Sequence, residues 1–104
     1  MKGNLYQDLQ PPLRGELFET LLQHGRLRIE RILSSAEPEP VLYDQEQDEW
    51  VLLLEGRAEL RVAHEILELE AGDHVFIPAH TPHEVLSTTP EPRCLWLAVH
   101  LDPG

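Results

Sequence analysis

The sequence predicts a single all-β domain of the barrel or sandwich type, and three features carry this prediction. The chain has 104 residues, which suffices for one hydrophobic core. From Trp50 onward, β-type runs of about five residues recur roughly every eight to twelve residues. Turn residues such as Gly56, Gly72 and Pro82 separate these runs, and no helical pattern lies between them. Short strands at such regular spacing are typical of barrels and sandwiches.

Composition and charge exclude several classes of partner. Hydrophobic residues make up 41% of the chain and charged residues 26%, which is ordinary for a globular protein. The formal net charge of −11 would repel nucleic-acid phosphates and anionic lipid. No apolar run approaches the roughly 20 residues of a membrane helix, and residues 1–12 carry no export signal. We therefore expect a cytoplasmic protein whose partner is a small molecule, with no nucleic-acid or membrane partner.

The N-terminal part is expected to lie outside the barrel. Residues 1–25 are predicted to form an arm and a short helix that packs on the barrel, and residues 26–104 are predicted to form the barrel domain. The helix is inferred from apolar pairs four residues apart, with Gly25 as its C-cap. These pairs are Leu17 with Leu21 and Phe18 with Leu22.

The run that begins at Glu49 is apolar on both faces. Alternation places Glu49, Val51 and Leu53 on one face, whereas the intervening positions hold Trp50, Leu52 and Leu54. A strand with two apolar faces in so small a protein needs cover on both sides. Either the N-terminal helix supplies this cover or a second subunit does, which makes a homodimer a reasonable hypothesis.

Two groups of residues each contain a side chain that can bind a metal or a proton, at a characteristic distance along the chain from a glycine. In the first, Glu49 precedes Gly56 by seven positions. In the second, Gly72 is followed by Pro78 after five residues, and His83 comes five positions later. Gly72 suits a tight turn, Pro78 ends one strand and His83 opens the next. If Glu49 and His83 both point into the barrel, an acid and an imidazole meet in an apolar cavity, where such a pair binds metal or has shifted pKa values.

These two groups resemble the two motifs of the cupin superfamily over about residues 43–101. One motif has two histidines, a glutamate and a glycine, and the other is Gly-x5-Pro-x-Gly-x-x-His. The resemblance implies a double-stranded β-helix, the cupin jelly-roll barrel. It departs from the family in two places, because residues 42–45 read Leu-Tyr-Asp-Gln in place of the histidine pair, and His80 replaces the second glycine.

By this resemblance, a divalent metal ion such as Fe, Mn, Ni or Zn is expected inside the barrel. The expected metal ligands are Gln45, Glu49, His80 and His83, and the expected ligand-binding residues are Tyr43 and His100. His100 shares a face of the last strand with Trp96 and Ala98, so that it could reach the cavity.

Three functions remain open at this stage. The first is a metal-dependent enzyme of the oxygenase or isomerase type that acts on a small organic molecule. The second is a metal-free module in which Tyr43, Gln45, His83 and His100 bind a polar ligand without catalysis. The third is a purely structural dimeric domain. The sequence does not decide whether the protein is an enzyme, because the cupin fold carries many activities.

Overall fold

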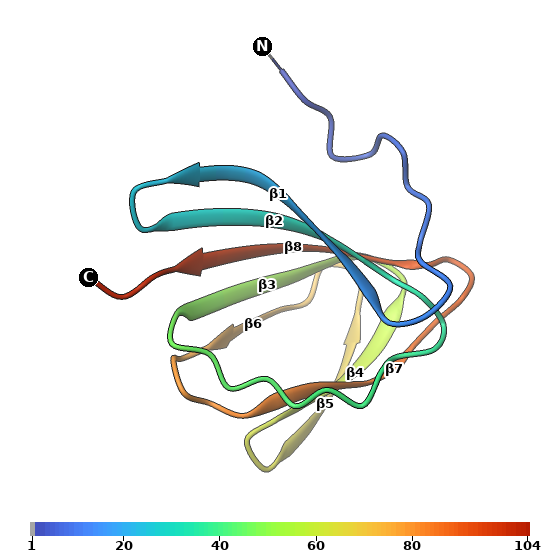
Figure 1. Cartoon of the computed structure of the whole chain (residues 1–104). Coiled ribbons are helices and arrows are strands. Elements are labelled where there is room, and N and C mark those ends of the chain that lie inside the picture. The colour runs from blue at the N-terminus through green and yellow to red at the C-terminus, as the bar shows by residue number, and fades with distance from the viewer. Residues whose placement is uncertain (1) are drawn as a thin grey trace.

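The computed structural model describes residues 2–104 as a barrel of eight antiparallel strands in two sheets (Figure 1). One sheet has the order β1-β2-β8-β3-β6 and the other has the order β5-β4-β7. In chain order the strands are β1 Glu16–His24, β2 Leu27–Ser34, β3 Asp48–Glu55, β4 Arg57–Val62, β5 Glu65–Glu70, β6 His74–Ile77, β7 His83–Thr88 and β8 Cys94–Leu101. The all-β prediction is therefore confirmed.

The predicted N-terminal helix is wrong, because β1 forms in its place. Phe18 pairs with Ile32 and His24 pairs with Leu27, so β1 and β2 are the two arms of a hairpin. Gly25 lies in its turn, where its φ of +58° favours glycine. A spacing of four is also a multiple of the strand period of two, so the apolar pairs fit both structures. Hydrogen bonding to β2 decides in favour of the strand.

The core lies between the two sheets. Val51, Leu53 and Trp96 come from the larger sheet, whereas Leu60 and Leu69 come from the smaller one, and all are buried. The alternation predicted for residues 49–54 is observed, since Glu49, Val51 and Leu53 are buried and the positions between them are half-buried. β3 lies between β8 and β6 in the larger sheet, and Glu49 lies on the face of β3 that points into the barrel.

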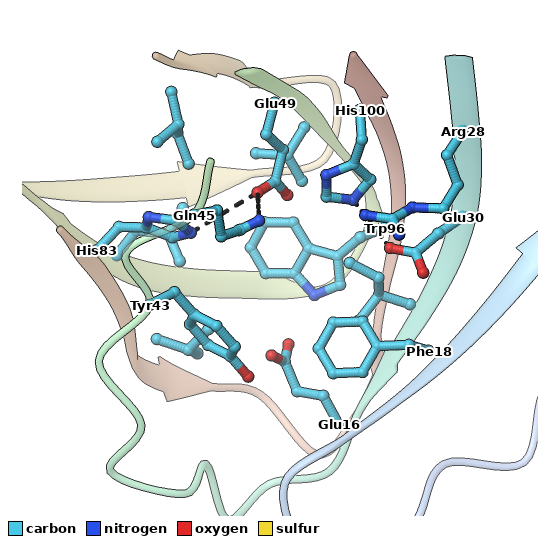
Figure 2. A pocket seen from close by; sticks show the side chains of 15 residues that line it. Glu16, Phe18, Arg28, Glu30, Tyr43, Gln45, Glu49, His83, Trp96 and His100 are labelled. Atoms are coloured by element: carbon cyan, nitrogen blue, oxygen red, sulfur yellow. Dashed lines mark hydrogen bonds and ion pairs between the residues drawn. The ribbon is translucent and has the colours of Figure 1, made fainter. Parts of the chain in front are cut away.

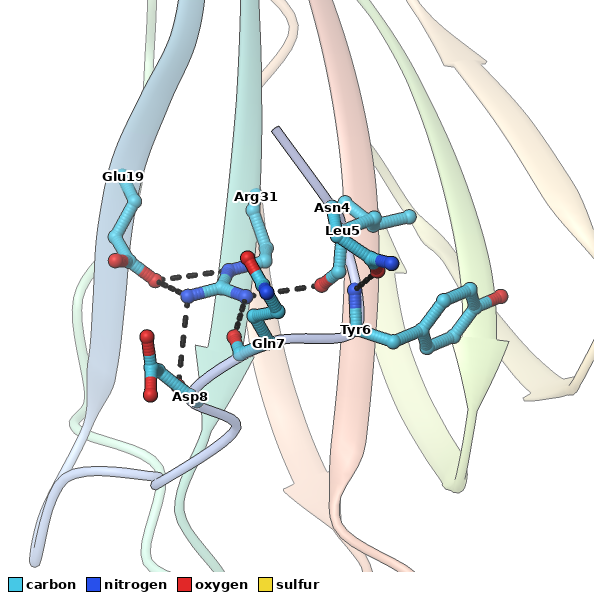
Figure 3. Close-up of polar contacts among 7 residues, drawn as sticks. All are labelled: Asn4, Leu5, Tyr6, Gln7, Asp8, Glu19 and Arg31. Atoms are coloured by element: carbon cyan, nitrogen blue, oxygen red, sulfur yellow. Dashed lines mark hydrogen bonds and ion pairs between the residues drawn. The ribbon is translucent and has the colours of Figure 1, made fainter. Parts of the chain in front are cut away.

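The N-terminal arm is held on the outer side of the larger sheet by one arginine (Figure 3). The guanidinium of Arg31, on β2, donates hydrogen bonds to the backbone carbonyl oxygens of Leu5, Gln7 and Asp8. It also forms an ion pair with Glu19 of β1, with 2.5 Å between Nη2 and Oε1. The described residues include no helix that is long and apolar enough to cross a membrane.

Candidate functional site

A cavity of about 130 Å³ lies inside the barrel, between the two sheets (Figure 2). Its apolar lining comes from strands of both sheets and includes Val51, Val85 and Trp96. Its polar lining contains three carboxylates, two imidazoles, one guanidinium, one phenol and one amide. These are Glu16, Glu30, Glu49, His83, His100, Arg28, Tyr43 and Gln45.

The first polar group of the cavity is centred on the carboxylate of Glu49. Glu49 Oε1 lies 3.6 Å from Nε2 of His83 and 3.4 Å from Nε2 of Gln45. The side chains of His83 and Glu49 are only 11% and 10% exposed. The structure therefore brings together three of the four residues that the sequence predicts as metal ligands.

The backbone around His83 holds its ring in one orientation. Tyr43 and His83 exchange two backbone hydrogen bonds, at 2.8 and 2.9 Å, and their rings stack with centroids 5.5 Å apart. Nδ1 of His83 lies 2.9 Å from the carbonyl oxygen of Thr81. Because a carbonyl can only accept, Nδ1 carries a proton in this arrangement, and Nε2 is the ring nitrogen that faces Glu49 and accepts a hydrogen bond when it carries no proton.

Burial raises the pKa of Glu49 to about 7. Repulsion by the carboxylates of Glu30 and Glu16 adds to this increase in the pKa, whereas Arg28 opposes it. The carboxyl group therefore gains and loses a proton near neutral pH, with Nε2 of His83 beside it to accept that proton. A group with such a pKa suits general acid and base catalysis.

The second polar group of the cavity comprises Arg28, Glu30 and His100, and lies on β2 and β8. His100 Nε2 is 2.8 Å from Oε1 of Glu30. Nδ1, the other ring nitrogen of His100, is buried without a hydrogen-bond partner within residues 2–104. Burial lowers the pKa of His100, and Glu30 opposes this effect. The ring is thus a buried polar group that contacts Glu30 through Nε2 and has no partner at Nδ1 among the described residues.

A chain of hydrogen bonds supports the floor of the cavity. Trp96 Nε1 donates to Oγ of Ser34 at 2.9 Å, and Oγ of Ser34 donates to Oε2 of Glu16 at 2.7 Å. Burial raises the pKa of Glu16, although the bond from Ser34 opposes this shift. These bonds fix the indole of Trp96 between the two polar groups (Figure 2).

His80 does not join the cavity. Its side chain is 69% exposed, and its Nδ1 lies 3.4 Å from Oδ1 of Asp44 at the surface. Its backbone has a φ of +60°, and its N–H donates to the carbonyl oxygen of Gln45 at 2.7 Å. His80 therefore adopts the left-handed conformation for which the cupin motif uses glycine. Its contact with the loop that carries Gln45 is made by its backbone N–H and not by its imidazole.

The donors in the cavity do not fit a resident transition-metal ion. Residues 2–104 contain no group of three His, Cys, Asp or Glu side chains arranged to hold one. Of the predicted ligands, only Glu49 and His83 bring a carboxylate and an imidazole to the cavity, because the side chain of His80 lies at the surface. The amide of Gln45 is also a weaker ligand for such an ion than the imidazole usual in cupins.

Glu16, Phe18, Arg28 and Glu30 line the cavity although the sequence did not predict them as site residues. Glu16 and Phe18 belong to the segment for which a helix was expected. Arg28 and Glu30 share one face of β2, but nothing in the sequence placed that strand in the same cavity as Glu49. The signal was the alternation of Arg28, Glu30 and Ile32, which puts two opposite charges on an otherwise apolar inner face.

The fold and the cavity define a small all-β barrel protein with one polar site between two sheets. The family model for the cupin domain matches residues 30–100. The chain therefore belongs to the cupin domain family, as its motifs predicted.

Solved structures share the fold. The chain is similar to a "putative mannose-6-phosphate isomerase" of Ralstonia eutropha JMP134, with 36% identity, 99% of each chain covered and a TM-score of 0.87. A protein of unknown function from Streptococcus pyogenes shares 23% identity, with 100% of this chain and 89% of that one covered and a TM-score of 0.81. A protein of Thermus thermophilus shares 22% identity, with 97% of this chain and 96% of that one covered and a TM-score of 0.85. No curated protein matches.

Proposed function

We propose that the protein binds a small polar organic molecule in its cavity and that Glu49 and His83 exchange a proton with it. The observation that carries this proposal is the Glu49 carboxyl group, whose pKa of about 7 places its titration near neutral pH. Its oxygen lies 3.6 Å from an imidazole nitrogen that can accept the proton. Apolar walls that include Val51, Val85 and Trp96 surround the pair and lower the local polarity, which strengthens its interaction with a bound molecule.

The reaction class that fits this pair is the movement of a proton on a substrate. Glu49 would accept a proton from a carbon or oxygen of the bound molecule and return it to the same or a neighbouring atom. Isomerases use such steps, and the name of the Ralstonia protein is consistent with that class. Tyr43 and Gln45 lie beside the pair and can hydrogen-bond the substrate.

The experiment follows binding and proton transfer in the same sample. Small polar hydroxy and carbonyl compounds are added to the labelled protein in D₂O, and NMR detects both shifts of cavity residues and exchange of carbon-bound hydrogen for deuterium. We expect the shifts to cluster at Val51 and Val85. Exchange should be lost in Glu49→Gln and reduced in His83→Gln, whereas the matched control His64→Gln, in an exposed turn, should behave as wild type.

Two results would contradict this proposal. One is that compounds bind outside the cavity or not at all. The other is stoichiometric binding of Fe, Mn, Ni or Zn that is lost in His83→Gln. The second result would support the competing hypothesis, in which Gln45, Glu49 and His83 hold a divalent ion and a ligand completes its coordination. Binding without hydrogen exchange would leave a ligand-binding module without catalysis.

A further inference from the structure

The Arg28 end of the cavity contains polar groups that no part of the described chain satisfies. Arg28 Nε and His100 Nδ1 are buried without a hydrogen-bond partner among residues 2–104, whereas His100 Nε2 lies 2.8 Å from Oε1 of Glu30. Buried polar groups in proteins are almost always hydrogen-bonded, so that such a cluster beside a cavity indicates where polar atoms of a ligand bind.

Arg28 differs from the arginines that have structural roles. Arg31, Arg61 and Arg93 each form an ion pair with a glutamate. Arg28 forms no ion pair with any residue in the range 2–104, although it lines the cavity next to Glu30 and His100 (Figure 2). Glu30 instead lies against His100. The guanidinium thus keeps its charge and its planar set of donors available for a bound group.

We infer that Arg28 binds the carboxylate of a small hydroxycarboxylic acid, a hydroxyl group of which can donate a hydrogen bond to Nδ1 of His100. The inference rests on the function proposed above, since it places the rest of that molecule beside Glu49 and His83. A guanidinium binds a carboxylate through two parallel hydrogen bonds. Figure 2 shows Arg28 and Glu30 on one side of the Trp96 indole and His83 and Gln45 on the other.

The charges in the cavity disfavour a ligand with two negative charges more than one with a single negative charge. Three carboxylates, Glu16, Glu30 and Glu49, face the same space as the one guanidinium. A phosphate ester with two negative charges would meet repulsion from all three and find one permanent cation. A carboxylate brings one charge, so it meets less repulsion and can accept two parallel hydrogen bonds from Arg28. The inferred ligand class therefore differs from the phosphorylated sugar in the name of the Ralstonia protein.

The size of the cavity limits the ligand further. A volume of about 130 Å³ is close to that of the roughly 150 Å³ apolar cavities that hold one benzene molecule. Such a space suits an acid with a chain of three or four carbons, whose hydroxyl groups reach Tyr43, Gln45 and Glu49.

The test compares matched compounds that differ only in their terminal group. Calorimetric titration would use glycerate and erythronate as carboxylates, glycerol and erythritol as neutral forms, and glycerol 3-phosphate and erythritol 4-phosphate as phosphate esters. We expect the carboxylates to bind at least about tenfold more tightly than either other class, as a charge-assisted contact implies.

Variants assign this preference to Arg28. Arg28→Gln should weaken carboxylate binding by about tenfold or more and leave any binding of the neutral compounds unchanged. Arg28→Lys keeps the charge without the planar pair of donors and should recover part of the affinity. Arg57→Gln removes an exposed positive charge outside the cavity and should bind as wild type does. Thermal midpoints check that each variant is folded.

Several outcomes would overturn the inference. These are equal binding of neutral and carboxylate compounds, preferred binding of the phosphate esters, no binding of either carboxylate, or unchanged carboxylate affinity in folded Arg28→Gln. Each is distinguishable from failure of the proposed function. The proposed function would still stand if other compounds shift the NMR signals of Val51 and Val85 and exchange hydrogen for deuterium through Glu49. It would fail if erythronate bound to the wild type without any such exchange.

Discussion

Glu49 Oε1 lies 3.6 Å from Nε2 of His83, at a point where β3 of one sheet faces β7 of the other. Both side chains are almost fully buried, and burial favours the uncharged form of the Glu49 carboxyl group. The protonation of the site is therefore linked to the stability of the barrel. The side chain of Glu49 or His83 can be replaced while the apolar residues that line the cavity stay the same.

Glu49→Gln should remove a pH-dependent loss of stability. The pKa of Glu49 rises from 4.5 to about 7 on folding, so the folded state holds the proton more tightly than the unfolded chain. The free energy of unfolding therefore falls as the pH rises through this window. Between about pH 5.5 and about pH 8 the wild type should lose about 2 kcal/mol from this group. Urea denaturation across that range should show a correspondingly flatter profile for Glu49→Gln.

The control for this measurement is Glu68→Gln, which removes a carboxylate from an exposed position on β5. It should retain the pH profile of the wild type. Parallel profiles for wild type and Glu49→Gln would show that Glu49 titrates in the folded protein much as it does in the unfolded chain.

Gly56→Ala should destabilise the barrel more than Gly72→Ala does. Both glycines have a positive φ, +90° and +98°, so alanine is strained at either position. A Cβ at Gly56 would also lie 2.8 Å from Sγ of Cys94 and 2.9 Å from the carbonyl oxygen of Arg93, whereas Gly72 faces open space. We expect about 1–2 kcal/mol for Gly72→Ala and about 1–3 kcal/mol more for Gly56→Ala, measured by chemical denaturation. Equal losses would mean that the strand ends move apart to admit the methyl group.

We propose that a second copy of the chain covers the outer face of the larger sheet. The helix that could have covered this face does not form, and the N-terminal arm is held at Arg31, on β2. Trp50 and Leu52 on β3 and Leu97 on β8 remain half-buried there, and Phe76 on β6 is 57% exposed. An apolar face of this kind, rich in aromatic and aliphatic side chains, is typical of interfaces between identical subunits.

Light scattering on the purified protein tests the dimer. The wild type should have twice the chain mass of 11.9 kDa, and Leu52→Glu should have the mass of one chain. Ile66→Glu makes the same kind of change at an exposed position on β5 of the other sheet and should leave the mass unchanged. A wild type that has the mass of one chain at micromolar concentration would contradict the dimer.

The sequence pattern predicted the secondary structure correctly where the spacing of apolar residues fitted only the strand period and not the helical period. The alternation from Glu49 to Leu54 placed Glu49 on the inner face, and its spacing to Gly56 identified it as the acidic residue of the site. The segment of β1 is ambiguous because the apolar residues 17, 18, 21 and 22 satisfy both the helical and the strand period. The preference for a strand comes from hydrogen bonds to β2, which the local pattern does not contain.

His80 shows a further limit of motif spacing. Its distance along the chain from His83 would allow both imidazoles to meet one ion. The left-handed backbone of His80 instead turns its side chain toward Asp44 at the surface. Its N–H bonds to the carbonyl oxygen of Gln45, and this contact joins two loops that are far apart in the chain, so local spacing does not reveal it.

The sequence by itself determined the fold class through the spacing of its strand runs, and the resemblance of its motifs to those of cupins indicated the family and pointed to Glu49, His83 and His100 as candidates for the site. Only the tertiary structure decided that Glu49 and His83 meet inside the barrel and that Arg28 and Glu30 lie beside His100 at the other end of the same cavity. The reason is that β2 pairs with β8 and β8 with β3. Strand order depends on packing of the whole chain, so the charges that surround a site are known only when distant strands are placed side by side.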